Sequence, residues 1–191
     1  MAKLTSRISL LPISLIEIKI FLRVTHSDED AFLVQLVKSA RNFVEMMTNE
    51  AVTEATYLEY FNWDGESLIC PQMLNVSAIT LVEYLNSSEV WTTVTSPFEI
   101  WPGSEPPYFR LISDEEADNN ALFWAFLTDP QGDPNLRITY KAGAATIDAV
   151  SEHFIDVMYN YCGFFYENRQ AAAAPKFLIE HATLNRKKSD I

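Results

Sequence analysis

The fold is decided by one stretch of the sequence, SDEDAFLVQLVKSARNFVEMMTN, which spans residues 27–49. Ser27 is a favoured helix N-cap, and the three acidic residues after it suit the positive end of a helix dipole. Asn49 tolerates the left-handed conformation in which helices often end. The apolar residues recur at intervals of one, three and four, which is a single stripe on an α-helix: Phe32, Leu33, Leu36, Val37, Ala40, Phe43, Val44 and Met47. This stretch therefore predicts an amphipathic helix over about 28–48.

Two further helices are predicted, one on each side of this element. Ser14 and Glu17 form a capping-box pattern, which predicts a short helix over about 14–22. A second run predicts a long helix over about 147–169, because its apolar residues again fall at helical spacing: Ile147, Val150, Phe154, Val157, Met158, Tyr161 and Phe165. Each of these helices has an apolar face to bury, so we expect them to share one helical core.

The middle of the chain, about residues 52–141, is predicted to be rich in β-strands. Segments of β-branched and aromatic residues alternate there with turn residues, and they predict strands near 55–61, 68–70, 76–85, 90–95, 108–112 and 136–141. After Arg169, a run of alanines and a proline leads into a tail over 171–191. From Lys176 onward this tail is expected to be either a short helix or a segment that becomes ordered only on meeting a partner. The predicted fold class is α+β: a helical bundle core with an inserted antiparallel β-rich middle, forming a single domain over 1–170, and a C-terminal tail.

The charge of the chain is strongly acidic. It carries 14 Lys and Arg against 26 Asp and Glu, a net charge of −12, and there is no Lys or Arg between Asn42 and Phe109. Tight sequence-independent binding of DNA requires cations that neutralise phosphates, so we do not expect it here. Two readings of the acidic middle remain open: a solvated surface that keeps the protein soluble, or a surface that repels phosphate or meets a basic partner.

No motif in the sequence points to catalysis, a cofactor or a metal. The three histidines, His26, His153 and His181, stand outside any motif, and the acidic residues near His26 are explained by helix capping. Cys70 and Cys162 are far apart and lack a CxxC partner, so we expect two plain thiols. We therefore predict a protein that is not an enzyme, with no cofactor.

The N-terminal segment superficially resembles a signal peptide. Its apolar run from Ile8 to Ile20 is interrupted by Pro12, Glu17 and Lys19, and no small-residue cleavage site follows. We interpret it as an extended arm that leads into the first helix, and we expect the protein to be made in the cytoplasm. No apolar run is long enough for a transmembrane helix.

The last predicted helix carries more aromatic residues than one buried stripe can accommodate. A helix that is apolar on all sides must be buried on all sides, which points to contacts beyond the core. We take Tyr159, Phe164, Tyr166 and Arg169 as candidates for an interface between subunits.

A series of short motifs then gives the chain a family resemblance. They occur in this order: SLIEIKIFLRV at 14–24, SDED at 27–30 with Leu33, Leu36, Ala40 and Phe43 after it, Met47-Thr48-Asn49, Cys70-Pro71, VSAI at 76–79, ITYKAG at 138–143 and YENR at 166–169. In this order and spacing the chain resembles the head–tail connector (adaptor) proteins of tailed bacteriophages, also described as DNA-packaging proteins. Asn49 stands where the family usually has glycine, and the region from Asn86 to Gln131 is long for it.

The resemblance implies a virion protein that works mechanically. It implies a ring, typically of twelve subunits, beneath the portal protein at the capsid vertex. Such a ring would extend the DNA channel without gripping DNA, and would dock a neck or tail-completion protein. The basic tail is then a hypothetical portal-docking element: Lys176, Phe177, Leu178, Arg186, Lys187 and Lys188. The acidic middle is a hypothetical channel or rim surface: Glu83, Glu89, Glu99 and Glu105. The alternatives are a tail-side neck or tail-completion protein, or a hydrolase that uses acidic residues.

Overall fold

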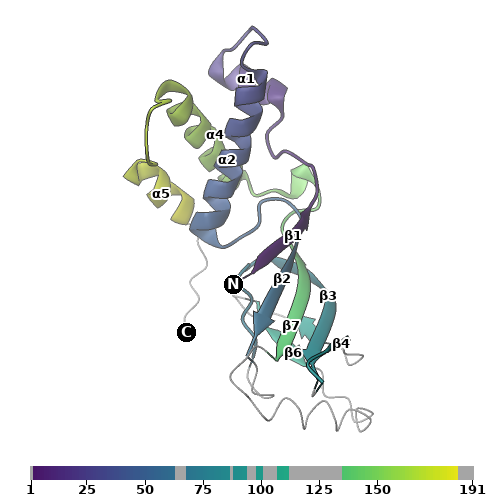
Figure 1. The fold of residues 1–191 in the computed structure, drawn as a ribbon. Helices are drawn as coiled ribbons and strands as arrows, with labels where there is room; N and C mark the ends of the chain where they lie inside the picture. The colour runs from purple at the N-terminus through teal and green to yellow at the C-terminus, as the bar shows by residue number, and fades with distance from the viewer. Residues whose placement is uncertain are drawn as a thin grey trace. The chain divides into compact units, whose positions relative to one another are not determined.

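The computed structural model describes residues 2–62, 68–86, 88–93, 98–100, 107–111 and 135–184. The chain divides into two compact units (Figure 1). The helical unit is built from Ile8–Glu54 and Gly143–Lys188, and the sheet unit from Met1–Arg7 and Ala55–Ala142. The helical unit is therefore discontinuous in sequence, with the β-rich segment inserted into it. This confirms the predicted α+β class.

The first two helices of the helical unit begin and end close to the predicted residues. α1 spans Leu15–Leu22, and both halves of the Ser14–Glu17 capping box are formed. α2 spans Asp30–Thr48, two residues shorter at its start than predicted, because Glu29 and not Ser27 occupies its N-cap position. Asn49 ends α2 in the left-handed conformation, with φ of 57°.

The last predicted helix is divided in the structure. A short 3-10 helix, η2, spans Ile147–Ala149, and α4 spans Glu152–Glu167. The prediction of one continuous helix from 147 was wrong at this point, since Val150 has an extended backbone that breaks the helical hydrogen bonding. A further helix, α5, spans Lys176–Thr183 in the region predicted as a tail.

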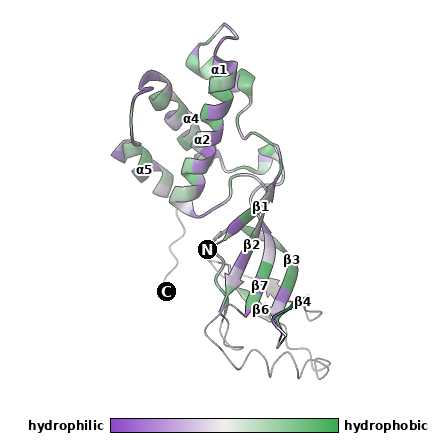
Figure 2. Ribbon diagram, viewed as in Figure 1, coloured by the Kyte–Doolittle hydropathy of each residue, from purple (hydrophilic) through white to green (hydrophobic). Residues whose placement is uncertain are grey.

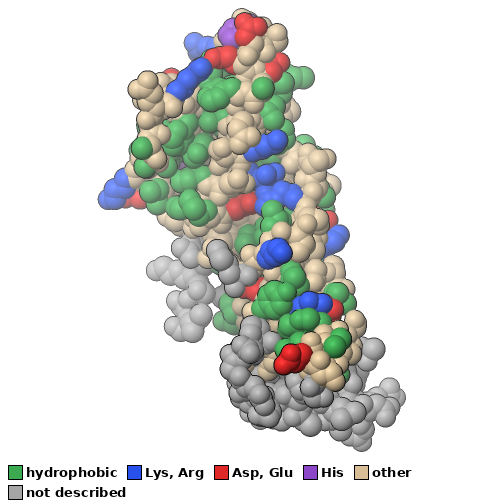
Figure 3. Space-filling view, in the orientation of Figure 1, with side chains coloured by type: hydrophobic (Ala, Val, Ile, Leu, Met, Phe, Trp, Pro, Cys, Tyr) green, Lys and Arg blue, Asp and Glu red, His purple; other side chains and the backbone are tan. Residues whose placement is uncertain are grey.

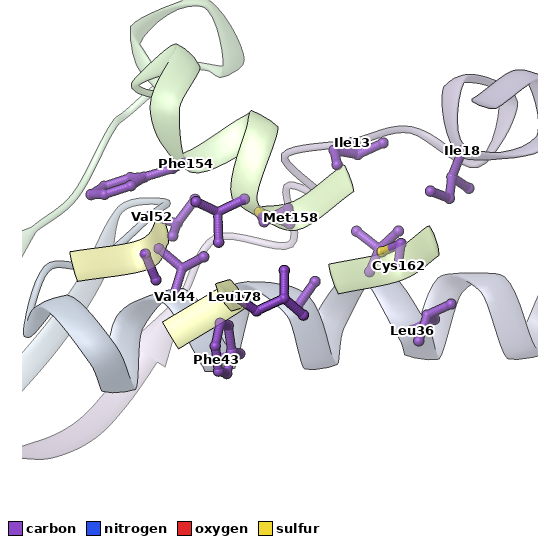
Figure 4. Packing of buried hydrophobic residues seen from close by; sticks show 14 of the residues in the cluster. Ile13, Ile18, Leu36, Phe43, Val44, Val52, Phe154, Met158, Cys162 and Leu178 are labelled. Atoms are coloured by element: carbon purple, nitrogen blue, oxygen red, sulfur yellow. The ribbon is translucent and has the colours of Figure 1, made fainter. Parts of the chain in front are cut away.

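The core of the helical unit lies between its helices (Figure 4). α2 supplies most of one side through its apolar stripe, and apolar and polar residues alternate along it in Figure 2. α4 contributes the other side, and α5 adds two residues to it. The most completely buried side chains include Ile13, Ile18, Leu33, Val37, Val44, Val157, Met158, Cys162 and Leu178.

The sheet unit contains a five-stranded antiparallel sheet in the order β1-β2-β7-β3-β4. Its strands are β1 (Lys3–Arg7), β2 (Ala55–Phe61), β3 (Val76–Leu85), β4 (Trp91–Thr93) and β7 (Leu136–Ala142). The predicted extended arm is thus an edge strand, paired with β2. β5 (Phe98–Ile100) and β6 (Phe109–Leu111) form a separate pair. The strand predicted over 68–70 is reduced to one bridge between Ile69 and Phe109.

The two faces of this sheet differ in burial. In β2 and β7, alternate residues are buried, so one face packs inward and the other is more exposed. Tyr140, Ile138 and Leu136 from β7 have no exposed surface, and Phe109 packs edge-on against the Tyr140 ring. The inner face is therefore a second hydrophobic core, separate from the helical one.

Candidate interaction surfaces

The exposed side of α1 is apolar. α1 contains more isoleucine and leucine than the core can cover. Ile18 is fully buried, whereas Ile16 and Ile20 are 71% and 72% exposed. These two residues are four apart and so lie on the same helix face. They line a groove of about 430 Å³ whose other lining residues include the cations Lys19 and Arg23. The Lys19 Nζ lies 2.6 Å from an Asp30 carboxylate oxygen, whereas Arg23 forms no ion pair with any described residue.

The end of α4 is fastened to the start of α2 by a polar cluster. The Glu29 carboxylate accepts hydrogen bonds from the Tyr166 hydroxyl at 2.7 Å and from the Arg169 guanidinium at 2.5 Å. Both bonds, first the one from Tyr166, lower the pKa of Glu29 below its usual range. The bond to Glu29 raises the pKa of Tyr166 above its usual range. The guanidinium also lies over the rings of Phe32 and Tyr166. Tyr166 and Arg169, predicted as subunit-interface residues, thus bind within their own chain.

The other two predicted interface residues also contact their own chain. Tyr159 is half-buried, with its ring centroid 4.8 Å from that of Phe21 on α1, and burial raises its pKa. Phe164 is half-buried, and its ring meets Phe165 and Phe177 edge-on. Surplus aromatic surface on α4 is therefore largely used to hold α1, α2 and α5 to it.

The residues predicted for portal docking fall into three groups in the structure. Lys176 is exposed and pairs with Glu180 one turn later, and Phe177 is 55% exposed. Leu178 is fully buried in the helical core, so its side chain does not face a partner. The other three predicted residues, Arg186, Lys187 and Lys188, lie outside the described residues.

The outer face of the sheet is not an acidic surface where the structure describes it. Glu83 lies directly opposite Arg137 in the β3–β7 register and accepts two hydrogen bonds from it, at 2.6 and 2.7 Å. These bonds raise the pKa of Arg137, whose guanidinium also lies 4.6 Å from the centre of the Trp91 ring. Glu89 is exposed in a turn. The other two predicted members, the Glu99 side chain and Glu105, lie outside the described residues.

A buried carboxylate on the inner face of the sheet was not identified from the sequence. Glu59 is 6% exposed and accepts hydrogen bonds from the Tyr140 hydroxyl at 2.9 Å and the Gln72 backbone N–H at 3.0 Å. Burial and the nearby Glu59 charge raise the pKa of Tyr140. The signal was present in the alternation of β2, which places Glu59 on the same face as Ala55 and Tyr57. This network fastens the segment after Cys70 to the sheet, so it has a structural explanation.

The described residues contain no group of three or more His, Cys, Asp or Glu arranged to hold a metal ion. Both cysteines are free. Burial raises the pKa of Cys162 to about 12, and burial with the Glu59 charge raises that of Cys70. Reactive cysteines need a lowered pKa, so neither thiol is activated. Within the described part of the chain, no helix is both long and apolar enough to cross a membrane.

Comparison with known proteins supports the family resemblance over part of the chain. Residues 12–95 match the model of the phage gp6-like head-tail connector protein family. This segment includes α1, α2, β2, β3 and β4, and so contains parts of both units. No match was found among curated proteins.

Solved structures show that the whole fold is shared with chains of gene transfer agent particles. A chain in the neck of an empty gene transfer agent particle, computed with C6 symmetry, has a TM-score of 0.74 at 15% identity, with 100% of this chain and 97% of that chain covered. A chain in the native virion has a TM-score of 0.70 at 16% identity. A chain in the native neck, computed with C12 symmetry, has a TM-score of 0.71 at 15% identity, and the coverage of both chains is the same in each case. At these identities the likeness shows the fold alone.

Proposed function

We propose that this chain, whose residues 12–95 match the head-tail connector family, is a structural virion protein of the neck and not an enzyme. One observation carries the proposal: residues 12–95 match the head-tail connector family model. A fold shared over 100% of this chain with a chain from a gene transfer agent neck is consistent with it. The geometry supports it, since the ionisable groups that are buried or strongly paired serve to fasten the fold together.

The finer role that we propose is a ring, twelve-fold in symmetry, beneath the portal protein. The neck structures that share the fold were computed with C6 and C12 symmetry, which supports a ring of repeated subunits. DNA would pass through such a ring without tight binding, because the chain carries a net charge of −12. In the described sheet Glu59 is buried and Glu83 is paired with Arg137, so an acidic channel surface would depend on Glu89, Glu99 and Glu105.

The portal-docking surface that we propose is smaller than the one predicted from the sequence. Leu178 is left out because it belongs to the helical core. Lys176 and Phe177 present an exposed cation and an exposed aromatic ring at the start of α5. Arg186, Lys187 and Lys188 follow α5 in sequence and supply the remaining positive charge.

Mixing the purified protein with its portal protein tests this function. We expect rings by native mass spectrometry and electron microscopy, either spontaneously or once portal is added. A chain that stays monomeric in both conditions would contradict the proposal. A chain ending at Leu184 should keep the far-ultraviolet circular dichroism of the full protein but bind portal more weakly. A chain ending at Arg169 is not an equivalent test, because it also removes the buried Leu178.

A second position in the neck is consistent with the same comparisons. The names of the similar structures specify the neck but not its head side or its tail side. Deletion of the gene separates the two positions. Loss of a head-side connector should give filled heads that leak DNA, whereas loss of a tail-side completion protein should give filled heads that remain stable.

A further inference from the structure

The helical unit has an apolar surface with a positive charge that forms no ion pair with the residues that the structure describes. Ile16 and Ile20 on α1 are each more than 70% exposed, and hydrophobic side chains reach the surface of this unit in Figure 3. The groove that they line also contains Arg23, which ends α1 in the left-handed conformation. Isolated exposed aliphatic residues are common, but two on one helix face, beside a groove that also contains a cation, form a surface suited to binding.

The same unit has a second exposed surface of opposite charge. Ile147 in η2 is 44% exposed, and Asp148 beside it is exposed. Glu152 and Asp156 are exposed on one face of α4, since they are four residues apart. These three carboxylates form no ion pair with any described residue.

From these two surfaces we infer that the α1 groove of one subunit receives the Ile147–Asp156 surface of a second copy of the chain. In this arrangement, Ile147 enters the groove beside Ile16 and Ile20, and the carboxylate of Asp148 or Glu152 approaches Arg23. The inference deepens the proposed function, on which it rests, by naming the interface that joins subunits. The residues first expected to do this at the end of α4 instead bind within their own chain.

The complementarity of the two surfaces favours a second copy as the occupant. An interface that closes a ring joins two different faces of the subunit, and here one face is apolar with a cation and the other is apolar with anions. Burial of the isoleucine side chains supplies the affinity, and the opposite charges fix the register and disfavour contact of either face with itself.

Cysteine cross-linking tests this contact directly. In a Cys70→Ser background, which removes the half-buried thiol, we replace Ile20→Cys in one protein and Ile147→Cys in another. Oxidation of the mixture in the presence of portal should give a covalent heterodimer, and a protein with both cysteines should give a ladder of covalent multimers. A matched control pairs Ile20→Cys with Leu184→Cys, another highly exposed position in the helical unit. Equal cross-linking of the control, or of Ile20→Cys protein with itself, would overturn the inference.

Charge reversal gives an independent test with a rescue. Arg23→Glu should weaken ring formation at least about tenfold, because it places like charges across the interface. Adding Asp148→Lys and Glu152→Lys to the same chain should restore it. If the triple variant assembles no better than Arg23→Glu, the proposed pairing is wrong.

Comparison with the wild-type protein distinguishes failure of the inferred interface from failure of the proposed connector function. The inference would be overturned, and the connector function would stand, if wild type and Arg23→Glu both formed rings and the Ile20→Cys and Ile147→Cys proteins did not cross-link. A wild-type chain that stays monomeric with portal would overturn both.

Discussion

Replacement of Leu178 by alanine tests whether α5 is part of the helical core or a detachable tail. Leu178 is fully buried among side chains of α2 and α4. Leucine-to-alanine changes at such sites lose the transfer free energy of the side chain and leave a cavity, at a cost of about 3 kcal/mol. For a chain of this length, that corresponds to a fall in Tm of about 6–12 °C. The same change at Leu184, which is 73% exposed, provides the matched control and should cost less than about 0.5 kcal/mol.

The assay can follow each unit by its own signal. α1, α2, α4 and α5 all belong to the helical unit, so circular dichroism at 222 nm reports mainly on that unit. The four tryptophans, at positions 63, 91, 101 and 124, all fall within Ala55–Ala142, so tryptophan fluorescence reports on the other segment. Urea titrations of Leu178→Ala should shift the circular dichroism transition to lower urea, and the fluorescence shows whether the sheet unit unfolds with it. A circular dichroism midpoint equal to that of Leu184→Ala would refute the placement of α5 in the core.

Three other changes probe particular contacts. Tyr140→Phe removes the hydroxyl that donates to the buried Glu59 carboxylate, and should destabilise the sheet unit by about 1.5–3 kcal/mol in fluorescence-detected urea unfolding. Glu29→Gln should make the helical unit less sensitive to acid. Because folding lowers the pKa of Glu29, its contribution is present above the ordinary value of 4.5 and is lost as pH falls through the lower folded pKa, so wild type and variant should converge in acid. Gly143→Ala should cost about 1–3 kcal/mol by thermal unfolding, since Gly143 has φ of +97° and an added Cβ would lie 2.5 Å from the Thr53 carbonyl oxygen. An alanine variant as stable as wild type would contradict this geometry.

Local signals predicted the first two helices well. The Ser14–Glu17 capping box and the left-handed stop at Asn49 depend on a few neighbouring residues, so one sequence is enough to read them. The break at Val150 was missed because the apolar spacing continues through it while the backbone does not. Periodicity records which residues are buried, and a 3-10 turn followed by a helix can bury the same ones.

Long-range pairing was beyond the same reasoning. β7 lies between β2 and β3, although a long stretch of sequence separates it from both, and no local pattern specifies that order. The intrachain partners of the candidate surface residues were missed for a related reason. Glu83 appeared as a free acidic residue because its partner, Arg137, is distant in sequence. Tyr166 and Arg169 appeared free because their partner, Glu29, is also distant in sequence. The pairing of a charged residue can be recognised from the sequence only when its partner is close in the sequence.

The interrupted course of the chain has a consequence for how the protein folds. The two segments of the helical unit, Ile8–Glu54 and Gly143–Lys188, are joined through the whole of Ala55–Ala142. If this intervening segment were a random coil, bringing its ends together would cost about 4 kcal/mol in entropy. The antiparallel pairing of β2 with β7 places Ala55 directly opposite Ala142, so formation of the sheet already brings those ends together. A protein whose sheet forms first therefore assembles its helices as if the intervening segment were a short turn.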